Sequence, residues 1–175
     1  MRLTLIAAQS LDGFITRHDH PGSGFASDAD RAFFREALRA FDCCVMGGET
    51  YRVSRDTIRA TLMPERLRVV LTRAPEAFAN DTAPGKLEFV NTPPAQLAAD
   101  LHQRGFQRCA ILGGAQVHSL FIDAGLVDEL WLTIEPLLFG GGTALLAQPT
   151  AAKLSLVSSE KLSSNALLLK YRVEK

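Results

Sequence analysis

The sequence predicts an α/β fold in which helices cover both faces of a mainly parallel central sheet and an antiparallel strand pair ends the chain. Short, continuous apolar segments alternate with helical ones, which is typical of parallel strands buried on both faces. Two final strand-like segments, 154–162 and 166–173, flank Asn165, a residue that suits the turn of an antiparallel pair. The length of 175 residues predicts a single domain, residues 1–175.

The first strand and the first helix are expected to be separated by a long loop. Leu3–Ala8 is a short apolar segment of the kind that forms a buried strand. Residues 12–26 are rich in Gly, Pro, Asp and His, so they predict a loop. Ser27 or Asp28 can cap a helix beginning there, because apolar side chains then recur close to helical spacing.

Strands and helices are expected to alternate through the rest of the chain. Buried strands are predicted at residues 43–46, 67–71, 87–90, 109–112 and 126–134. A helix over 93–104 begins at a Pro-Pro pair and stops before Gly105, as these residue types favour. A second helix, 115–123, directly follows Gly113-Gly114.

Composition and charge narrow the class of protein. Apolar residues make up 47% and charged residues 22%, as in an ordinary globular protein, and the net charge of zero indicates neither a nucleic acid nor a membrane as partner. The three cysteines include the neighbours Cys43 and Cys44 and predict buried thiols rather than disulfides or a zinc site. The first apolar run is too short for a signal peptide, so we expect a cytoplasmic protein. We also expect no bound metal.

The most informative segment is Gly113-Gly114, where an apolar strand meets an amphipathic helix. Adjacent glycines let the backbone approach a ligand closely, and the first N–H groups of the helix remain free to bind an anion. The pattern is neither G-x-G-x-x-G nor a P-loop. A pyrophosphate site and a simple tight turn are therefore both open interpretations.

Four motifs in order resemble the dihydrofolate reductase-like superfamily. They most closely resemble the reductase domain of the bifunctional deaminase–reductase of riboflavin biosynthesis, the RibD C-terminal domain family. The motifs are Leu5–Ile15 with its Ser-Leu-Asp-Gly-Phe-Ile, Val45–Tyr51, Leu112–Ala115 followed by Gly125–Leu130, and Pro136–Gly142. The resemblance implies an oxidoreductase that uses NADPH and forms a homodimer.

The resemblance also implies which residues bind NADPH. They are Ala8, Ile15, Gly47, Thr50, Thr72, Arg73, Gly113, Gly114, Ala115, Gln116 and Val117. Ala8 and Ile15 would offer backbone groups to the nicotinamide carboxamide, with simple core packing as the alternative interpretation. Arg73 would grip the 2′-phosphate, for which a guanidinium is well shaped, or would be a solvated surface residue. In the dihydrofolate reductases the Gly-Gly peptide is cis, so a cis bond is expected between Gly113 and Gly114.

On the substrate side, the resemblance assigns a catalytic carboxylate to Asp30. Thr133 would support this carboxylate, which would hold the N–H edge of a ring, and Phe25 and Phe34 would line the substrate site. An exposed acid stabilising the start of a helix is the other interpretation of Asp30, and we assign that role to Asp28.

Several residues depart from the family patterns. Gly48 replaces a phosphate-binding arginine, Leu112 replaces a glutamate used for the substrate, and Phe25 replaces a loop tryptophan. The Asp-Pro stretch that holds a ribose phosphate has no counterpart here, nor does the zinc motif of the deaminase. These departures argue against the riboflavin intermediate as the substrate.

Three functions follow from these observations. The first is an NADPH-dependent reductase that transfers hydride to a C=N or C=O bond of a small pterin- or pyrimidine-like substrate. The second is a nucleotide- or pterin-binding module with little or no turnover. The third, a purely structural domain, is disfavoured by four motifs in the right order.

Overall fold

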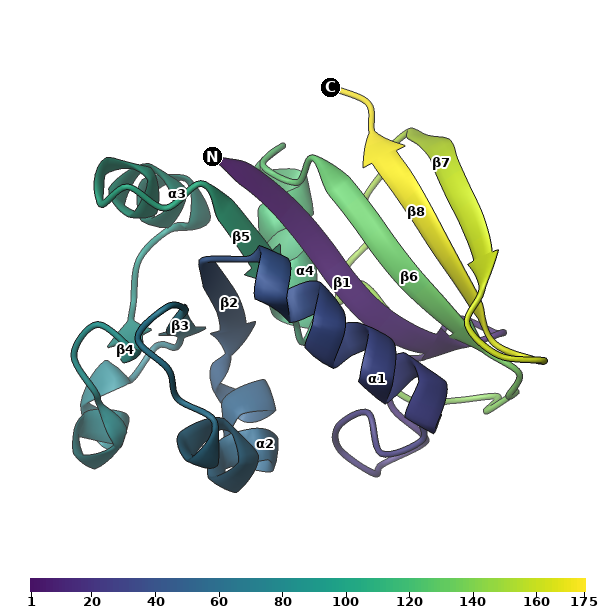
Figure 1. Cartoon of the computed structure of the whole chain (residues 1–175), viewed down its shortest axis with the longest axis horizontal. Helices are drawn as coiled ribbons and strands as arrows, with labels where there is room; N and C mark the ends of the chain where they lie inside the picture. The colour runs from purple at the N-terminus through teal and green to yellow at the C-terminus, as the bar shows by residue number, and fades with distance from the viewer.

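The computed structural model describes residues 1–175 and contains one eight-stranded sheet of order β4-β3-β2-β5-β1-β6-β8-β7 (Figure 1). The strands are β1 (Arg2–Ser10), β2 (Cys43–Gly47), β3 (Leu67–Leu71), β4 (Leu87–Val90), β5 (Arg108–Ile111), β6 (Glu129–Glu135), β7 (Leu154–Lys161) and β8 (Leu167–Val173). The first six are parallel, whereas β8 runs antiparallel to both β6 and β7. The predicted fold class is confirmed.

Helices cover both faces of the sheet. They are α1 (Asp28–Ala37), α2 (Gly48–Ala60), α3 (Pro94–Gln103) and α4 (Ala115–Asp123), with short 3-10 helices η1 (Leu38–Ala40) and η2 (Pro75–Asp81). In Figure 1, α1 crosses the near face of the sheet and α4 lies behind it. None of these helices has the length and apolar character needed to cross a membrane.

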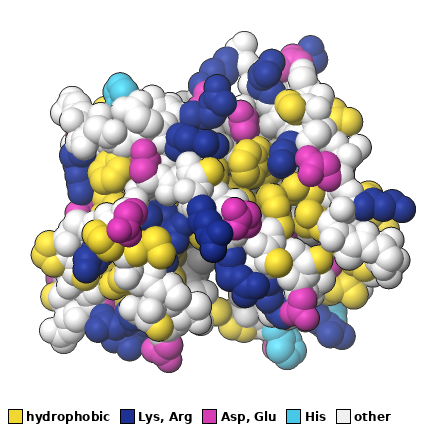
Figure 2. Space-filling model, viewed as in Figure 1, with side chains coloured by type: hydrophobic (Ala, Val, Ile, Leu, Met, Phe, Trp, Pro, Cys, Tyr) yellow, Lys and Arg dark blue, Asp and Glu magenta, His cyan; other side chains and the backbone are white.

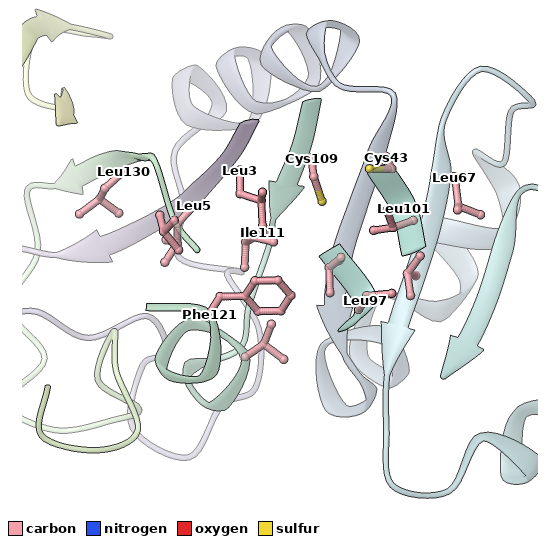
Figure 3. Close-up of a cluster of buried hydrophobic side chains, with 14 of the residues drawn as sticks. Leu3, Leu5, Cys43, Leu67, Leu97, Leu101, Cys109, Ile111, Phe121 and Leu130 are labelled. Carbon is pink, nitrogen blue, oxygen red and sulfur yellow. The ribbon is translucent and has the colours of Figure 1, made fainter. Parts of the chain in front are cut away.

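Each buried strand supplies side chains to two cores, because successive residues point to opposite faces. Cys43 and Val45 of β2 join the core beneath α3 and α4, in which Phe121 lies beside Ile111 (Figure 3). The alternate residues of β2 join the second core, beneath α1 and α2. The three cysteines are buried and free, as predicted.

The predicted start of β6 at Leu126 is wrong, because the strand begins at Glu129. Gly125, with φ +66°, ends the preceding helix, and residues 126–128 form a connection. Asp128 pairs with Leu3 twice, since its carboxylate accepts the Leu3 N–H at 2.8 Å and its own N–H donates to Leu3 O at 2.9 Å. The apolar character of residues 126 and 127 reflects burial in this connection rather than a strand. At the opposite end, β1 continues past the predicted Ala8 to Ser10, which pairs with Glu135.

Charged side chains of both signs are interspersed on the face shown in Figure 2, with hydrophobic groups between them. This distribution agrees with the net charge of zero. Nothing on this face forms a large field of one sign.

A buried carboxylate fixes α2 to η2. Asp81 accepts hydrogen bonds from Arg55 Nε at 2.7 Å and from its Nη2 at 2.5 Å, from Arg59 at 2.9 Å and from the Tyr51 hydroxyl at 2.9 Å. The hydrogen bonds from Arg55, together with its charge, lower the pKa of Asp81 from 3.8 to about 2. The cluster holds the segment after β3 against the helix after β2.

Asp81→Asn is expected to lower the free energy of unfolding by about 1–3 kcal/mol, which is the range for charged hydrogen bonds. Because the folded pKa is depressed, this stabilisation is present above pH 3.8 and is lost as the pH falls toward about 2. Urea unfolding at pH 7 and pH 2 measures both effects. Asp56→Asn, which alters an exposed carboxylate on α2, is the control. An equal Asp81→Asn effect at both pH values would contradict this account.

Candidate functional site

The candidate site lies at the carboxyl ends of the parallel strands. The chain places β5 between β1 and β2, so consecutive connections diverge at this point in the sheet. Ligands of open α/β sheets bind outside the carboxyl ends of strands at such switch points. The residues that the sequence singled out lie in the ends of β1, β2 and β6 or in the loops and helices that follow β1, β2, β3 and β5.

Two glycine pairs meet at the centre of this edge. The Gly47 N–H donates to Gly113 O at 2.6 Å, and the Gly113–Gly114 peptide is cis, as the resemblance implied. A Cβ added to Gly47 would lie 3.2 Å from Val117 Cγ2, which leaves no ready room for a side chain. The turns after β2 and β5 are therefore packed directly on each other.

Hydroxyl groups face the same glycines. A Cβ on Gly114 would lie 3.5 Å from Thr50 Oγ1, and one on Gly48 would lie 3.4 Å from Thr72 Oγ1. The structure thus brings Thr50 and Thr72, which the resemblance assigned to NADPH binding, beside the glycine turns. Backbone surfaces without Cβ atoms, lined by hydroxyls, suit the close approach of phosphate oxygens.

Two helices begin at this position without a side-chain cap. Gly47 is the N-cap of α2 and Gly114 is the N-cap of α4, and neither has a side chain to accept a hydrogen bond. The N–H groups of the first turn, which include Ala115, Gln116 and Val117 in α4, have no partner within the helix. Two positive helix ends therefore converge, an arrangement that favours binding of an anion.

Basic side chains stand at the rim of this cradle. Arg73 directly follows Thr72 at the end of β3, is exposed and forms no ion pair or hydrogen bond in the structure. Arg52 of α2 lies over the Phe78 ring, 5.0 Å from its centroid, and pairs with Glu49. Of these two basic residues at the rim, Arg73 is therefore the one whose side chain has no partner within the protein.

The nicotinamide end of the predicted site is formed by β1 and the loop after it. Ala8 is half-buried and pairs with Thr133 of β6. The Ile15 N–H donates to Thr143 O at 2.8 Å, so the N–H group is already engaged and only the carbonyl remains for a ligand.

The first part of the long loop is held in place. Asp12 accepts the Gly140 N–H at 2.7 Å and the Phe139 N–H at 3.1 Å, and the Ser10 hydroxyl donates to it at 2.6 Å. These hydrogen bonds, the one from Ser10 first, lower the pKa of Asp12. Residues 12–18 therefore sit on the loop after β6.

Asp30 lies at the substrate end, in the first turn of α1. Asp30 is only 9% exposed, whereas the Asp28 side chain is 99% exposed. Asp28 is therefore the solvated acid at the start of the helix. Burial is the main cause of a raised pKa for Asp30, the charge of Glu135 adds to it, and a Thr133 hydrogen bond and Arg31 oppose it. Thr133 thus lies near enough to Asp30 to influence its pKa.

The two predicted aromatic residues have separate surroundings. The Phe25 ring packs edge-on against Phe139, with centroids 5.1 Å apart. Phe34 is half-buried and packs against the core beneath α1 and α2. The structure brings Asp30 and Thr133 together but does not show Phe25 and Phe34 in one contact cluster with them.

Sequence reasoning missed Glu135 at the end of β6. It is only 2% exposed, and its Oε1 accepts the Ser27 N–H at 2.9 Å and the Ser27 hydroxyl at 2.8 Å. Glu135 stands two residues after Thr133, hence on the same face of the strand. A charged residue two positions after Thr133, at the end of a buried strand, is the feature of the sequence that could have indicated Glu135.

An open cavity of about 710 Å³ lies at the opposite, amino-terminal edge of the sheet. Its charged residues largely pair with one another, as Arg2 does with Glu129 at 3.3 Å and Lys175 with Asp128 at 2.7 Å. It contains none of the predicted site residues. We therefore assign the site to the carboxyl edge, which carries the glycines, the uncapped helix ends and the buried carboxylates.

The sheet order, the Gly-Gly turn and the buried acid on the first helix define a protein with the dihydrofolate reductase-like fold. The RibD C-terminal domain family matches residues 2–168, and the chain belongs to that family.

Relatives agree with this family. The riboflavin biosynthesis protein RibD of Corynebacterium ammoniagenes is 29% identical over 156 residues, which are 84% of this chain and 46% of that protein. The chain thus spans about half the length of this relative.

Solved structures share the fold. A pyrimidine reductase-like protein from Corynebacterium diphtheriae has a TM-score of 0.76 at 18% identity, covering 99% of this chain and 92% of that one. A diaminohydroxyphosphoribosylaminopyrimidine deaminase/5-amino-6-(5-phosphoribosylamino)uracil reductase from Thermotoga maritima has a TM-score of 0.79 at 19% identity, covering 98% and 56%.

Proposed function

We propose that the protein is a cytoplasmic, NADPH-dependent reductase that delivers hydride to a C=N or C=O bond of a small pyrimidine- or pterin-like substrate. The observation that carries this proposal is the convergence of two uncapped helix ends on a glycine surface beside Thr50 and Thr72. The family, and the names of related proteins of known structure, support a reductase acting on a pyrimidine.

The residues present fit NADPH. The first turns of α2 and α4 would hold the pyrophosphate, the Thr50 and Thr72 hydroxyls would add hydrogen bonds, and Arg73 would contact the 2′-phosphate. When bound, the cofactor supplies the hydride. The protein's part is to position the two reacting groups and to exclude water.

Asp30 is the chain's candidate for orienting the substrate. A buried carboxyl group beside Thr133 can accept hydrogen bonds from a ring N–H and an amino group. Its raised pKa also brings it closer to the range in which a carboxyl group can exchange a proton with a ring nitrogen.

A binding module with little turnover is the second candidate. Gly48 and Leu112 favour it, because the family resemblance places at these positions an arginine and a glutamate that contact ligands. Such a module would retain the cradle at Gly47 and Gly114 and lack part of the substrate site.

A direct test is NADPH oxidation with a panel of dihydropterins, dihydrofolate and ribosylaminopyrimidines, followed by absorbance. The reductase proposal predicts turnover of at least one pyrimidine or pterin, which Asp30→Asn should reduce by roughly 100-fold or more. Saturable NADPH binding without oxidation across the panel would instead favour the binding module.

We also propose that two copies of the chain form a homodimer, as the family resemblance implies. The edge strand β7 exposes Leu154, Leu156 and Val157, which would supply apolar contacts. Light scattering of the protein in solution measures its mass directly, and a monomer at micromolar concentration would refute this proposal.

A further inference from the structure

The start of α1 carries a sequence pattern that the structure only half fulfils. Ser27-Asp28-Ala29-Asp30 places an acid three residues after a serine N-cap, as in a capping box. In a complete box the serine hydroxyl accepts the N–H of the third residue, and the acid reaches back to the N–H of the serine. The first of these bonds is present, from the Asp30 N–H to Ser27 Oγ at 3.2 Å.

The second bond is made by a different residue. The Ser27 N–H donates to Glu135 Oε1 at 2.9 Å, and the Ser27 hydroxyl donates to the same oxygen at 2.8 Å. Glu135 belongs to β6 and is 108 residues away in the chain. Ser27 therefore has both of its donors and its acceptor satisfied without the side chain of Asp30.

The register of β6 explains why Glu135 reaches this helix end. Thr133 and Glu135 face the same side of the sheet, and they pair with Ala8 and Ser10 of β1. Glu135 consequently lies beside the first turn of α1, whose partial positive charge and two Ser27 donors stabilise a buried carboxylate.

We propose that Glu135 is a positioning residue that caps α1 in place of Asp30 and so leaves the Asp30 carboxyl group free to bind the N–H edge of a heterocyclic substrate. In a variant without Glu135, the Ser27 N–H would be left for the Asp30 carboxyl group to accept, as in an ordinary capping box. Glu135 also sets a negative charge beside Asp30, which favours the protonated form of that carboxyl group. The part that concerns substrate rests on the proposed function.

Two variants separate the charge of Glu135 from its hydrogen bonds. Glu135→Gln keeps an oxygen that accepts both Ser27 donors but removes the charge, whereas Glu135→Ala removes both. Asp28→Asn, which removes an exposed charge from the same helix turn, is the matched control. The ionisation of Asp30 is followed by carbon-13 carboxyl NMR, with its signal assigned by its absence in Asp30→Asn.

We expect Glu135→Gln to lower the pKa of Asp30 and Glu135→Ala to lower it further, because Asp30 then also accepts the Ser27 N–H. Arg31, the nearby cation, is unchanged in every variant. The control should leave the titration close to that of the wild type. An Asp30 pKa that is unchanged or raised in Glu135→Gln would overturn the proposal, and this variant retains the cap if Glu135→Ala does not fold.

A second readout is the affinity for 2,4-diaminopyrimidine, a probe with the proposed N–H edge, measured by calorimetry without cofactor. Glu135→Ala should weaken binding roughly 10- to 100-fold, the range for losing a charged hydrogen bond, and Glu135→Gln should weaken it less. Equal affinity in the wild type and Glu135→Ala would contradict the substrate-facing role. Neither readout requires NADPH or turnover. If the oxidation assay fails but the titration of Asp30 changes as expected, only the reductase proposal is refuted.

Discussion

Asp30→Asn is expected to lower kcat by roughly 100-fold or more, the scale on which a positioned proton-exchanging group contributes, while NADPH affinity stays unchanged. Asp30 lies on α1 beside Thr133, away from the glycines that form the phosphate cradle. Steady-state kinetics and direct titration with NADPH measure the two quantities. Asp28→Asn should leave both unchanged, and an equal loss of turnover and NADPH affinity in Asp30→Asn would contradict the assigned role.

Asp30→Asn is also expected to fold at least as stably as the wild type at pH 8. Burial raises the pKa of Asp30, so the folded state binds its proton more tightly than the unfolded state. Stability from this group is therefore present at low pH and is lost as the pH rises through the folded pKa. Asparagine cannot ionise, which removes the penalty, and thermal melts at pH 8 separate lost function from lost folding. A Tm lower in Asp30→Asn than in the wild type at pH 8 would contradict the predicted direction of the stability change.

Gly113→Ala is expected to destabilise the protein by about 2–4 kcal/mol, and so to lower Tm by roughly 5–15 °C. Gly113 has φ +94°, which an L residue rarely adopts, and a Cβ there would lie 2.8 Å from His118 Nε2. His118 cannot move away easily, because it is buried and its Nδ1 lies 2.9 Å from Leu145 O. Burial also lowers the pKa of His118 to about 4, so the ring is neutral at pH 7.

Gly105→Ala is the matched control for this substitution. Gly105 also has φ +94°, but a Cβ there would meet nothing within 4 Å. The control therefore measures the backbone penalty alone, and the additional loss in Gly113→Ala measures the contact with His118. Equal losses in the two variants would show that His118 does not support the Gly-Gly turn.

The features predictable from the sequence are those encoded by neighbouring residues. Gly113-Gly114 and Gly47 follow apolar strands directly, so their place at the carboxyl edge follows from the order of strand, turn and helix. Thr50 could be placed in the same cradle because it lies in the first turn of the next helix. Each of these inferences spans only a few residues.

The features that sequence reasoning missed depend on partners far apart in the chain. Glu135 is defined by its hydrogen bonds to Ser27, and the fixed conformation of residues 12–18 depends on the loop after β6, more than 120 residues away. A capping box at Ser27 is visible in the sequence, but which acid completes it depends on the register of β6 against β1. Pairing register and long-range polar contacts require the folded structure.

The central claim is that the glycine cradle and Arg73 bind NADPH, and thermal melting with nucleotide tests it most directly. NADPH at about 100 times its Kd should add about 2.7 kcal/mol, a rise of roughly 5–10 °C in Tm. The rise should be smaller with NADH, and Arg73→Ser should reduce the NADPH effect to the level of NADH. No change in Tm with either nucleotide at millimolar concentration would contradict the account.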